Sequence, residues 1–134
     1  MSFANVNWLA VLVCVVASMV VGFIWYHPAV FFKPWWAGLG KTKGPDNPNP
    51  VIYLYTAIAA AVQATFLAVL LASMPETGLM AGLKGGFMIW LGFIAPTNLV
   101  NKLFAGYNWK VWLIEAGGHL VNMLVFGAIL ALFG

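Results

Sequence analysis

The sequence predicts an all-α membrane protein whose four transmembrane helices pack as an antiparallel bundle. Four apolar segments indicate this class, because each has about the 20 residues that a helix needs to cross ~30 Å of hydrocarbon. The composition agrees, since the chain is 63% hydrophobic and 7% charged, against roughly 25% charged residues in soluble proteins. We expect one transmembrane domain over residues 1–134, with helices at residues 6–26, 51–73, 79–100 and 111–133.

The first segment is expected to remain as a helix and not to be cleaved as a signal peptide. It is longer than the apolar region of such a peptide, and residues 1–7 contain no basic side chain. After this helix, residues 28–39 are rich in large aromatic and apolar side chains, which predicts an interfacial aromatic segment between helices one and two. Residues 40–50 read GKTKGPDNPNP, and their prolines and glycines predict a solvated linker.

Turn residues predict where the other three helices begin and end. Asn49 or Pro50 is expected to open the second helix. The short turn at residues 74–78 predicts an antiparallel hairpin of the second and third helices, and residues 102–109 are expected to join the third and fourth similarly. Inside the third helix Pro96 lacks a backbone donor, which predicts a local kink.

Lysine positions predict the orientation in the membrane. Five of the six lysines fall in the two loops on one side of the predicted bundle: Lys33, Lys41, Lys43, Lys102 and Lys110. Lysine-rich loops stay cytoplasmic, so both termini are predicted to be periplasmic, with the reversed topology as the alternative because the count is small. Rings that favour the headgroup level are expected to anchor the inner boundary: Trp25, Tyr26, Trp35, Trp36, Trp109 and Trp112.

Small residues repeat along one side of each predicted helix. Apolar bulk does not drive helix association in lipid, so close backbone approach at small residues matters more. The candidate packing residues are Ser18, Gly22, Ala61, Ala64, Gly82, Gly85, Gly92 and Gly118. They predict a tightly packed bundle, or a bundle in which one stripe is a subunit interface with another copy or with other membrane-protein subunits.

One polar face lies within the fourth helix. Glu115, His119 and Asn122 are spaced i, i+4 and i+7 and therefore share a face. An ionisable group in hydrocarbon costs roughly 2.5–3.5 kcal/mol, so this face is expected to point toward protein. Residues expected near it are Thr97 and Asn98 on the third helix and Gln63 near the bilayer middle. The face is interpreted either as a structural link between helices or as a proton- or ion-linked site.

Other kinds of site are not indicated. His27 and His119 lie at different depths, and no paired-cysteine or histidine spacing typical of zinc occurs, so no metal site is predicted. Cys14 is a single cysteine inside the first helix and forms no intrachain disulfide. We predict no catalytic constellation, no cofactor and no nucleic-acid partner. A single histidine remains compatible with contact to a haem or another pigment.

A family resemblance rests on the end of the first helix. The pattern Trp25-Tyr26-x-Pro28-x-x-Phe31-x-x-x-Trp35, with Glu115-Ala116-Gly117 and a Gly127-Ala128-Ile129-Leu130 ending, resembles the small bacterial four-helix membrane proteins catalogued as domain of unknown function 1761. His27 departs from the small polar residue expected in that pattern. The resemblance implies a multi-pass protein of the bacterial inner membrane and supplies no activity.

Two functions are consistent with these features. The first is a non-catalytic accessory or packing subunit, either oligomeric or part of a larger membrane complex. The alternative is an oligomeric proton- or ion-linked transporter or channel that uses the face of Glu115, His119 and Asn122. Four helices are too few to enclose a roomy path alone, so the second function requires assembly.

Overall fold

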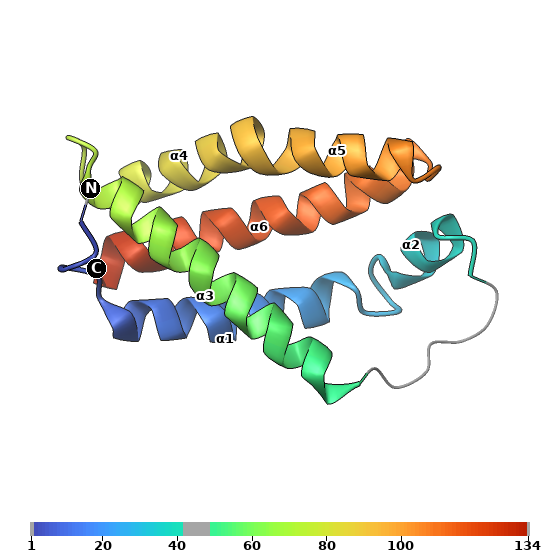
Figure 1. Cartoon of the computed structure of the whole chain (residues 1–134), viewed down its shortest axis with the longest axis horizontal. Coiled ribbons are helices and arrows are strands. Elements are labelled where there is room, and N and C mark those ends of the chain that lie inside the picture. The colour runs from blue at the N-terminus through green and yellow to red at the C-terminus, as the bar shows by residue number, and fades with distance from the viewer. Residues whose placement is uncertain (1, 42–48, 134) are drawn as a thin grey trace.

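The computed structural model describes residues 2–41 and 49–133, and within them it contains helices and no strand, as predicted. The elements are α1 (Trp8–Trp25), α2 (Phe32–Gly38), α3 (Pro50–Ala72), α4 (Leu79–Ile89), the π-helical turn η1 (Trp90–Ile94), α5 (Ala95–Phe104) and α6 (Trp109–Phe133). Figure 1 shows α4, η1 and α5 as one continuous helix. Together with α1, α3 and α6 it makes four helices long and apolar enough to cross a membrane.

The largest difference from the predicted boundaries is at the end of the third helix. The prediction stopped at residue 100, whereas α5 continues to Phe104. No proline or glycine occurs between Val100 and Gly106, which has a positive φ of 88° and turns the chain toward α6. Lys102, predicted as a loop residue, therefore stands in the last turn of α5. This extra turn brings its ammonium group within reach of α6.

The predicted aromatic segment contains the short helix α2. The rings of Tyr26 and Trp35 lie 4.7 Å apart, and Phe32 stacks on Trp36 at 5.3 Å. A Cβ on Gly38 would meet the Val111 side chain at 2.6 Å, so α2 lies directly against the start of α6. Lys43 and most of the predicted solvated linker fall at residues 42–48, outside the described residues.

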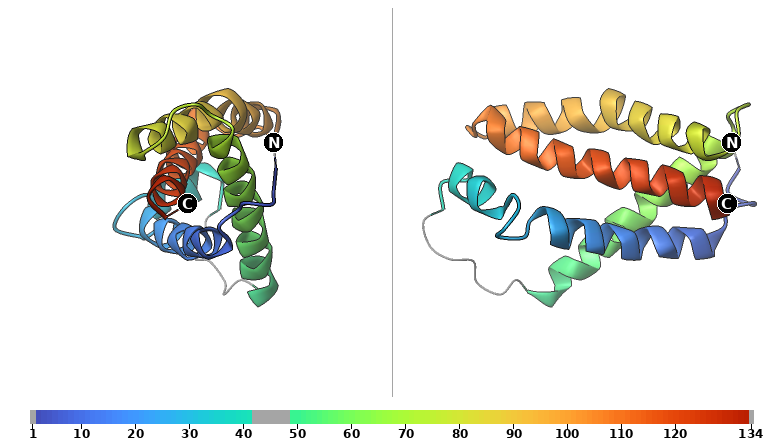
Figure 2. Two further views of the ribbon diagram at one scale, coloured as in Figure 1. Left: turned by 90° about the vertical axis from the view of Figure 1, so that its left-hand side faces the viewer. Right: turned by 180° about the vertical axis from the view of Figure 1, so that it is seen from behind.

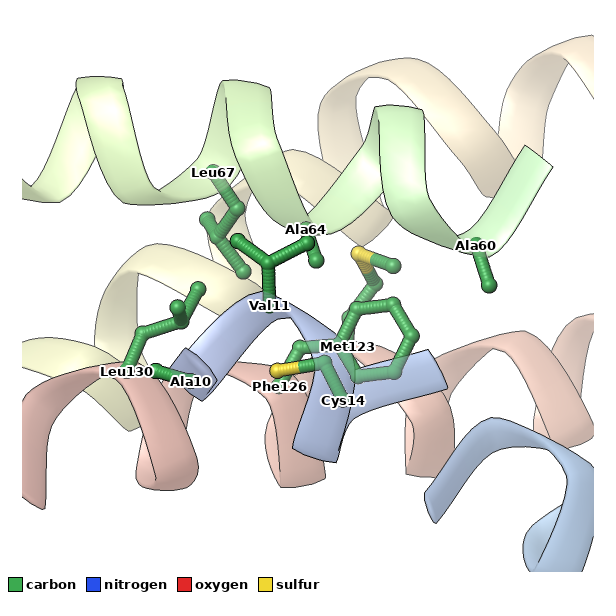
Figure 3. Close-up of a cluster of buried hydrophobic side chains, with 9 residues drawn as sticks. All are labelled: Ala10, Val11, Cys14, Ala60, Ala64, Leu67, Met123, Phe126 and Leu130. Carbon is green, nitrogen blue, oxygen red and sulfur yellow. The ribbon is translucent and has the colours of Figure 1, made fainter. Parts of the chain in front are cut away.

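α6 is the central helix of the structure, with α4–α5 along one side and α1 along another (Figures 1 and 2). α3 crosses α1 obliquely, and its first turns stand away from the other long helices (Figure 1). Side chains of α1, α3 and α6 meet in a buried apolar cluster, shown in Figure 3, of Ala10, Val11, Cys14, Ala60, Ala64, Leu67, Met123, Phe126 and Leu130.

Near Pro96, where a local kink was predicted, the structure has the π-helical turn η1 just before the proline. Proline lacks an N–H group, and its ring clashes with the carbonyl four residues earlier in an α-helix. In η1 the backbone N–H of Ala95 donates to the Trp90 carbonyl, five residues back. The wider turn accommodates the proline without ending the helix.

Candidate functional site

Glycines bring α4 and α6 into direct backbone contact. A Cβ built on Gly82 would overlap the carbonyl oxygen of Gly127, and one built on Gly127 would overlap that of Gly82. One turn further along, a Cβ on Gly86 would overlap the carbonyl oxygen of Met123. Neither helix can approach so closely with a larger side chain at these positions. This contact fixes α4 against α6 at the end of the molecule that holds both termini (Figure 1).

At the other end, Gly117 and Gly118 form a seat for the Trp25 ring. A Cβ on Gly117 would lie 2.8 Å from the ring, and one on Gly118 would lie 3.0 Å from it. The Trp25 Nε1–H donates to the Ile114 carbonyl at 2.7 Å. Because a carbonyl oxygen has two lone pairs, it can accept this bond beside its helical one. Trp25, predicted as an interface anchor, therefore directs its polar tip into the protein.

Two further indoles bond to backbone carbonyls between the α4–η1–α5 helix and α6. Trp90 Nε1–H in η1 donates to the Ala116 carbonyl at 2.7 Å. Trp112 Nε1–H on α6 donates to the Ala95 carbonyl at 2.9 Å. These two bonds tie the π-helical turn and the start of α5 to α6.

Glu115 is bound by groups from two other elements. Its Oε2 atom accepts a hydrogen bond from Trp35 Nε1 of α2 at 3.1 Å and lies 3.2 Å from Lys102 Nζ of α5. The side chains of Glu115 and Lys102 are 12% and 25% exposed. We call Glu115, Lys102 and Trp35 the Glu115 clamp, because the carboxylate holds α2 and α5 on α6.

Comparison with protein-family models identifies the family of the chain. The family model described as protein of unknown function (DUF1761) matches residues 9–131. The chain belongs to the DUF1761 family. The match includes the motif from Trp25 to Trp35 and all three residues of the Glu115 clamp. No curated protein and no solved structure matches the chain.

In this DUF1761 protein a line of polar residues continues inward from the clamp. α5 and α6 run in opposite directions past the Lys102–Glu115 contact, so one turn further along each helix brings Asn98 and His119 to the same level. Asn122 lies about one turn deeper on α6. The Oδ1 atoms of Asn98 and Asn122 are buried and have no hydrogen-bond partner among the described residues. We call this set the polar ladder; its members are Lys102, Glu115, Asn98, His119 and Asn122.

Two residues expected beside this face lie elsewhere. Thr97 is exposed, and its hydroxyl donates to the Phe93 carbonyl of its own helix at 2.7 Å. Gln63 on α3 is also exposed. The polar ladder is therefore formed by α5 and α6 without α3. Lys102 is the member that sequence reasoning missed as a partner of Glu115; its spacing of four from Asn98 was the available signal.

The candidate packing residues divide into two groups. Those in close contacts are Gly82, Gly118, the buried Ala64, Ala61 beside the apolar cluster, and Gly85, whose added Cβ would meet Leu71 at 2.5 Å. By contrast, a Cβ on Gly22 or Gly92 would meet nothing within 4 Å. The prediction that these two glycines mark close helix contacts is therefore wrong. Ser18 is half-buried.

Of the other predicted anchors, Trp35 belongs to the clamp, Trp36 lies under Lys41 at 4.4 Å, and Trp109 is 55% exposed. A separate cavity of about 300 Å³ lies at the opposite end, between the N-terminal segment and the ends of α3, α4 and α6. Glu76 at its rim pairs with Lys84 at 3.3 Å, and this pair is more than half exposed. No cluster of three metal-ligating side chains occurs among the described residues.

The indole bonds give a first testable result. Trp25→Phe and Trp90→Phe are each expected to lower the free energy of unfolding by about 1 kcal/mol, because each removes one hydrogen bond while the carbonyl keeps its helical partner. Trp109→Phe is the control and should leave stability unchanged, since that ring is largely exposed. Thermal unfolding in mild detergent measures all three. Equal stability of the three variants would contradict a role for these bonds.

Proposed function

We propose that this DUF1761 protein is a non-catalytic, multi-pass subunit of the bacterial inner membrane, in which four helices form an antiparallel bundle. In this role it packs against other copies or against the subunits of a larger membrane complex. The observation that carries the proposal is the Glu115 clamp. Its carboxylate, the one acidic group within the four spans, is already neutralised by a lysine of the same chain.

The clamp favours a structural role for Glu115. Lys102 and Trp35 both engage Oε2, and the carboxylate side chain is only 12% exposed. An ion or a reacting group would have to displace these partners, which come from α5 and α2. A buried charge that loses its partner strongly destabilises the folded protein. The clamp is therefore better suited to holding three elements together than to exchanging a ligand.

The outer surface supports action through membrane contacts. Large apolar side chains are exposed along the spans, among them Leu9, Phe23, Ile58, Met80 and Phe93. In a membrane this surface meets lipid or other subunits, and the loops between the spans leave little protein outside the bilayer. A chain with so little soluble mass acts most directly on neighbours within the membrane.

Isolation in mild detergent tests the proposal. The affinity-tagged chain is purified from native membranes, and its mass and co-purifying chains are recorded by native mass spectrometry. We expect a defined oligomer or a defined complex, and no solute-coupled flux after reconstitution into vesicles. A monomer without partners, or flux that depends on Glu115, would overturn the proposal.

A second function, an oligomeric proton- or ion-linked transporter, is favoured by the inner part of the polar ladder. Two buried amide oxygens have no partner among the described residues, and His119 stands at the level of one of them. Such groups can accept hydrogen bonds from water or from a small solute. The buried Phe126 and Met123 of the apolar cluster lie beyond Asn122, so passage would require these side chains to move.

Orientation is part of the proposal, with both termini periplasmic. α2 and the α5–α6 connection lie at one end of the molecule and the termini at the other (Figure 1), so Lys33, Lys41, Lys102 and Lys110 gather at one end. We expect Thr77→Cys, in a Cys14→Ala background, to react with an impermeant maleimide on intact cells. Lys110→Cys should react only after permeabilisation. The opposite pattern would reverse the assignment.

A further inference from the structure

Gln63 presents an exposed polar amide on α3, beside the buried Ala60 and Leu67. It lies near the middle of α3 and is exposed. No hydrogen bond joins its side chain to any described residue. The hydroxyl of Thr56, two turns earlier, is by contrast satisfied by the Ile52 carbonyl at 2.8 Å. Gln63 is therefore the polar side chain of α3 whose hydrogen-bonding groups remain free at mid-span.

An amide in this position is costly against acyl chains. Hydrocarbon offers neither donors nor acceptors, so an unpaired amide there costs several kcal/mol relative to water. Membrane helices reduce this cost through hydrogen bonds to a neighbouring helix. The long side chain of Gln63 is still about half a span from either headgroup layer, which limits its reach to water.

The surface around Gln63 permits a close neighbour. Thr56, Ala59 and Gln63 are spaced i, i+3 and i+7 and lie on one exposed side of α3. Two of the three are small, so another helix can approach the α3 backbone. Phe66 bounds this face toward the termini, where Phe3 packs edge-on against it at 5.4 Å between ring centroids. In Figure 2, α3 stands at one side of the molecule, where the N-terminal segment also runs.

We propose that this α3 face is a two-fold interface with a second copy of the chain, in which the two Gln63 amides bond to each other across the axis. This inference rests on the proposed role as a membrane subunit and names its partner. A carboxamide is self-complementary, because it carries both an acceptor oxygen and an NH₂ donor. In a two-fold interface a residue that lies on the axis meets the same residue of the other copy, so one Gln63 in each chain can supply both partners of the pair.

The first arm of the test measures dimer affinity. The chain is labelled and reconstituted at several protein-to-lipid ratios, and energy transfer between copies gives the dissociation constant. Gln63→Leu is expected to weaken dimerisation by about 3- to 20-fold, the range found for interhelical hydrogen bonds in membranes. Ile58→Ala, on a different exposed side of α3, is the matched control and should leave the dimer unchanged.

The second arm locates the interface in native membranes without depending on affinity. In a Cys14→Ala background, Ala59→Cys should form a disulfide-linked dimer on mild oxidation, whereas Ile58→Cys should not. The proposal is overturned if Ala59→Cys stays monomeric or links to a different chain, or if Gln63→Leu dimerises as well as the natural chain. Co-purification with another subunit would then still support the accessory role. Conversely, a Gln63-dependent dimer that conducts ions would overturn the accessory role and leave the interface standing.

Discussion

Gly82→Leu is expected to separate α4 from α6 and to destabilise the chain by about 3 kcal/mol or more, the largest effect of any single change considered. Overpacking a core typically costs 1–3 kcal/mol when side chains can shift. Here the obstacle is the Gly127 backbone, which cannot rotate away as a side chain can. Gly127→Leu should be equally severe, since its added Cβ would meet the Gly82 carbonyl.

Gly92→Leu and Gly22→Leu are the matched controls, because a Cβ at either position meets nothing within 4 Å. Leucine also has a better helix propensity than glycine, so these two variants should be neutral or slightly stabilised. Gly85→Leu should fall between the groups, since its neighbour is the flexible end of Leu71. Thermal unfolding in detergent ranks the variants. Similar unfolding temperatures for Gly82→Leu and Gly92→Leu would refute the backbone contact.

Glu115→Leu is expected to lower the free energy of unfolding by roughly 1–3 kcal/mol, because it leaves the Lys102 ammonium and the Trp35 indole without their acceptor. Breaking a fully buried ion pair costs about 3–5 kcal/mol, and the partial exposure of Lys102 reduces that cost. Adding Lys102→Met to Glu115→Leu should recover part of the loss, since no unpaired charge then remains.

Glu115→Gln separates the two functional proposals. Glutamine keeps an acceptor for Trp35, so an accessory subunit should fold and assemble with this variant at nearly natural stability. A proton-linked transporter should instead lose flux in reconstituted vesicles while remaining folded. If Glu115→Leu and Glu115→Gln are both as stable as the natural chain, the Glu115 clamp contributes nothing to the fold.

The helical class and the four apolar helices were predictable because length and hydropathy are properties of local sequence. The ends of the helices were harder to predict. No proline or glycine between Val100 and Gly106 marks the end of α5, and its additional turn makes Lys102 a partner of Glu115. Trp25 illustrates a different limit. An indole suits the headgroup level and also a glycine seat within the protein, and only the packing of α1 on α6 selects the second.

The candidate site was predictable along one helix and not between helices. The shared face of Glu115, His119 and Asn122 follows from helical periodicity alone. Gln63 was expected in the same polar group because it has a similar depth. Depth says nothing about direction, however, and Gln63 is exposed although Ala60 and Leu67, one helical turn away on either side, are buried. The same ambiguity affected the glycines, since Gly82 meets a neighbour whereas Gly92 meets none.

The π-helical turn at Trp90–Ile94 also sets the angle around the helix axis between α4 and α5. Asn98 follows Gly82 by sixteen positions, as Lys102 follows Gly86. In an uninterrupted α-helix that separation is about 4.4 turns, which would place each pair about 160° apart around the axis. The additional residue in η1 reduces the angle to roughly 60°. One helix therefore presents its glycines and its lysine to the same neighbour, α6, because it contains one residue more than a regular helix would need.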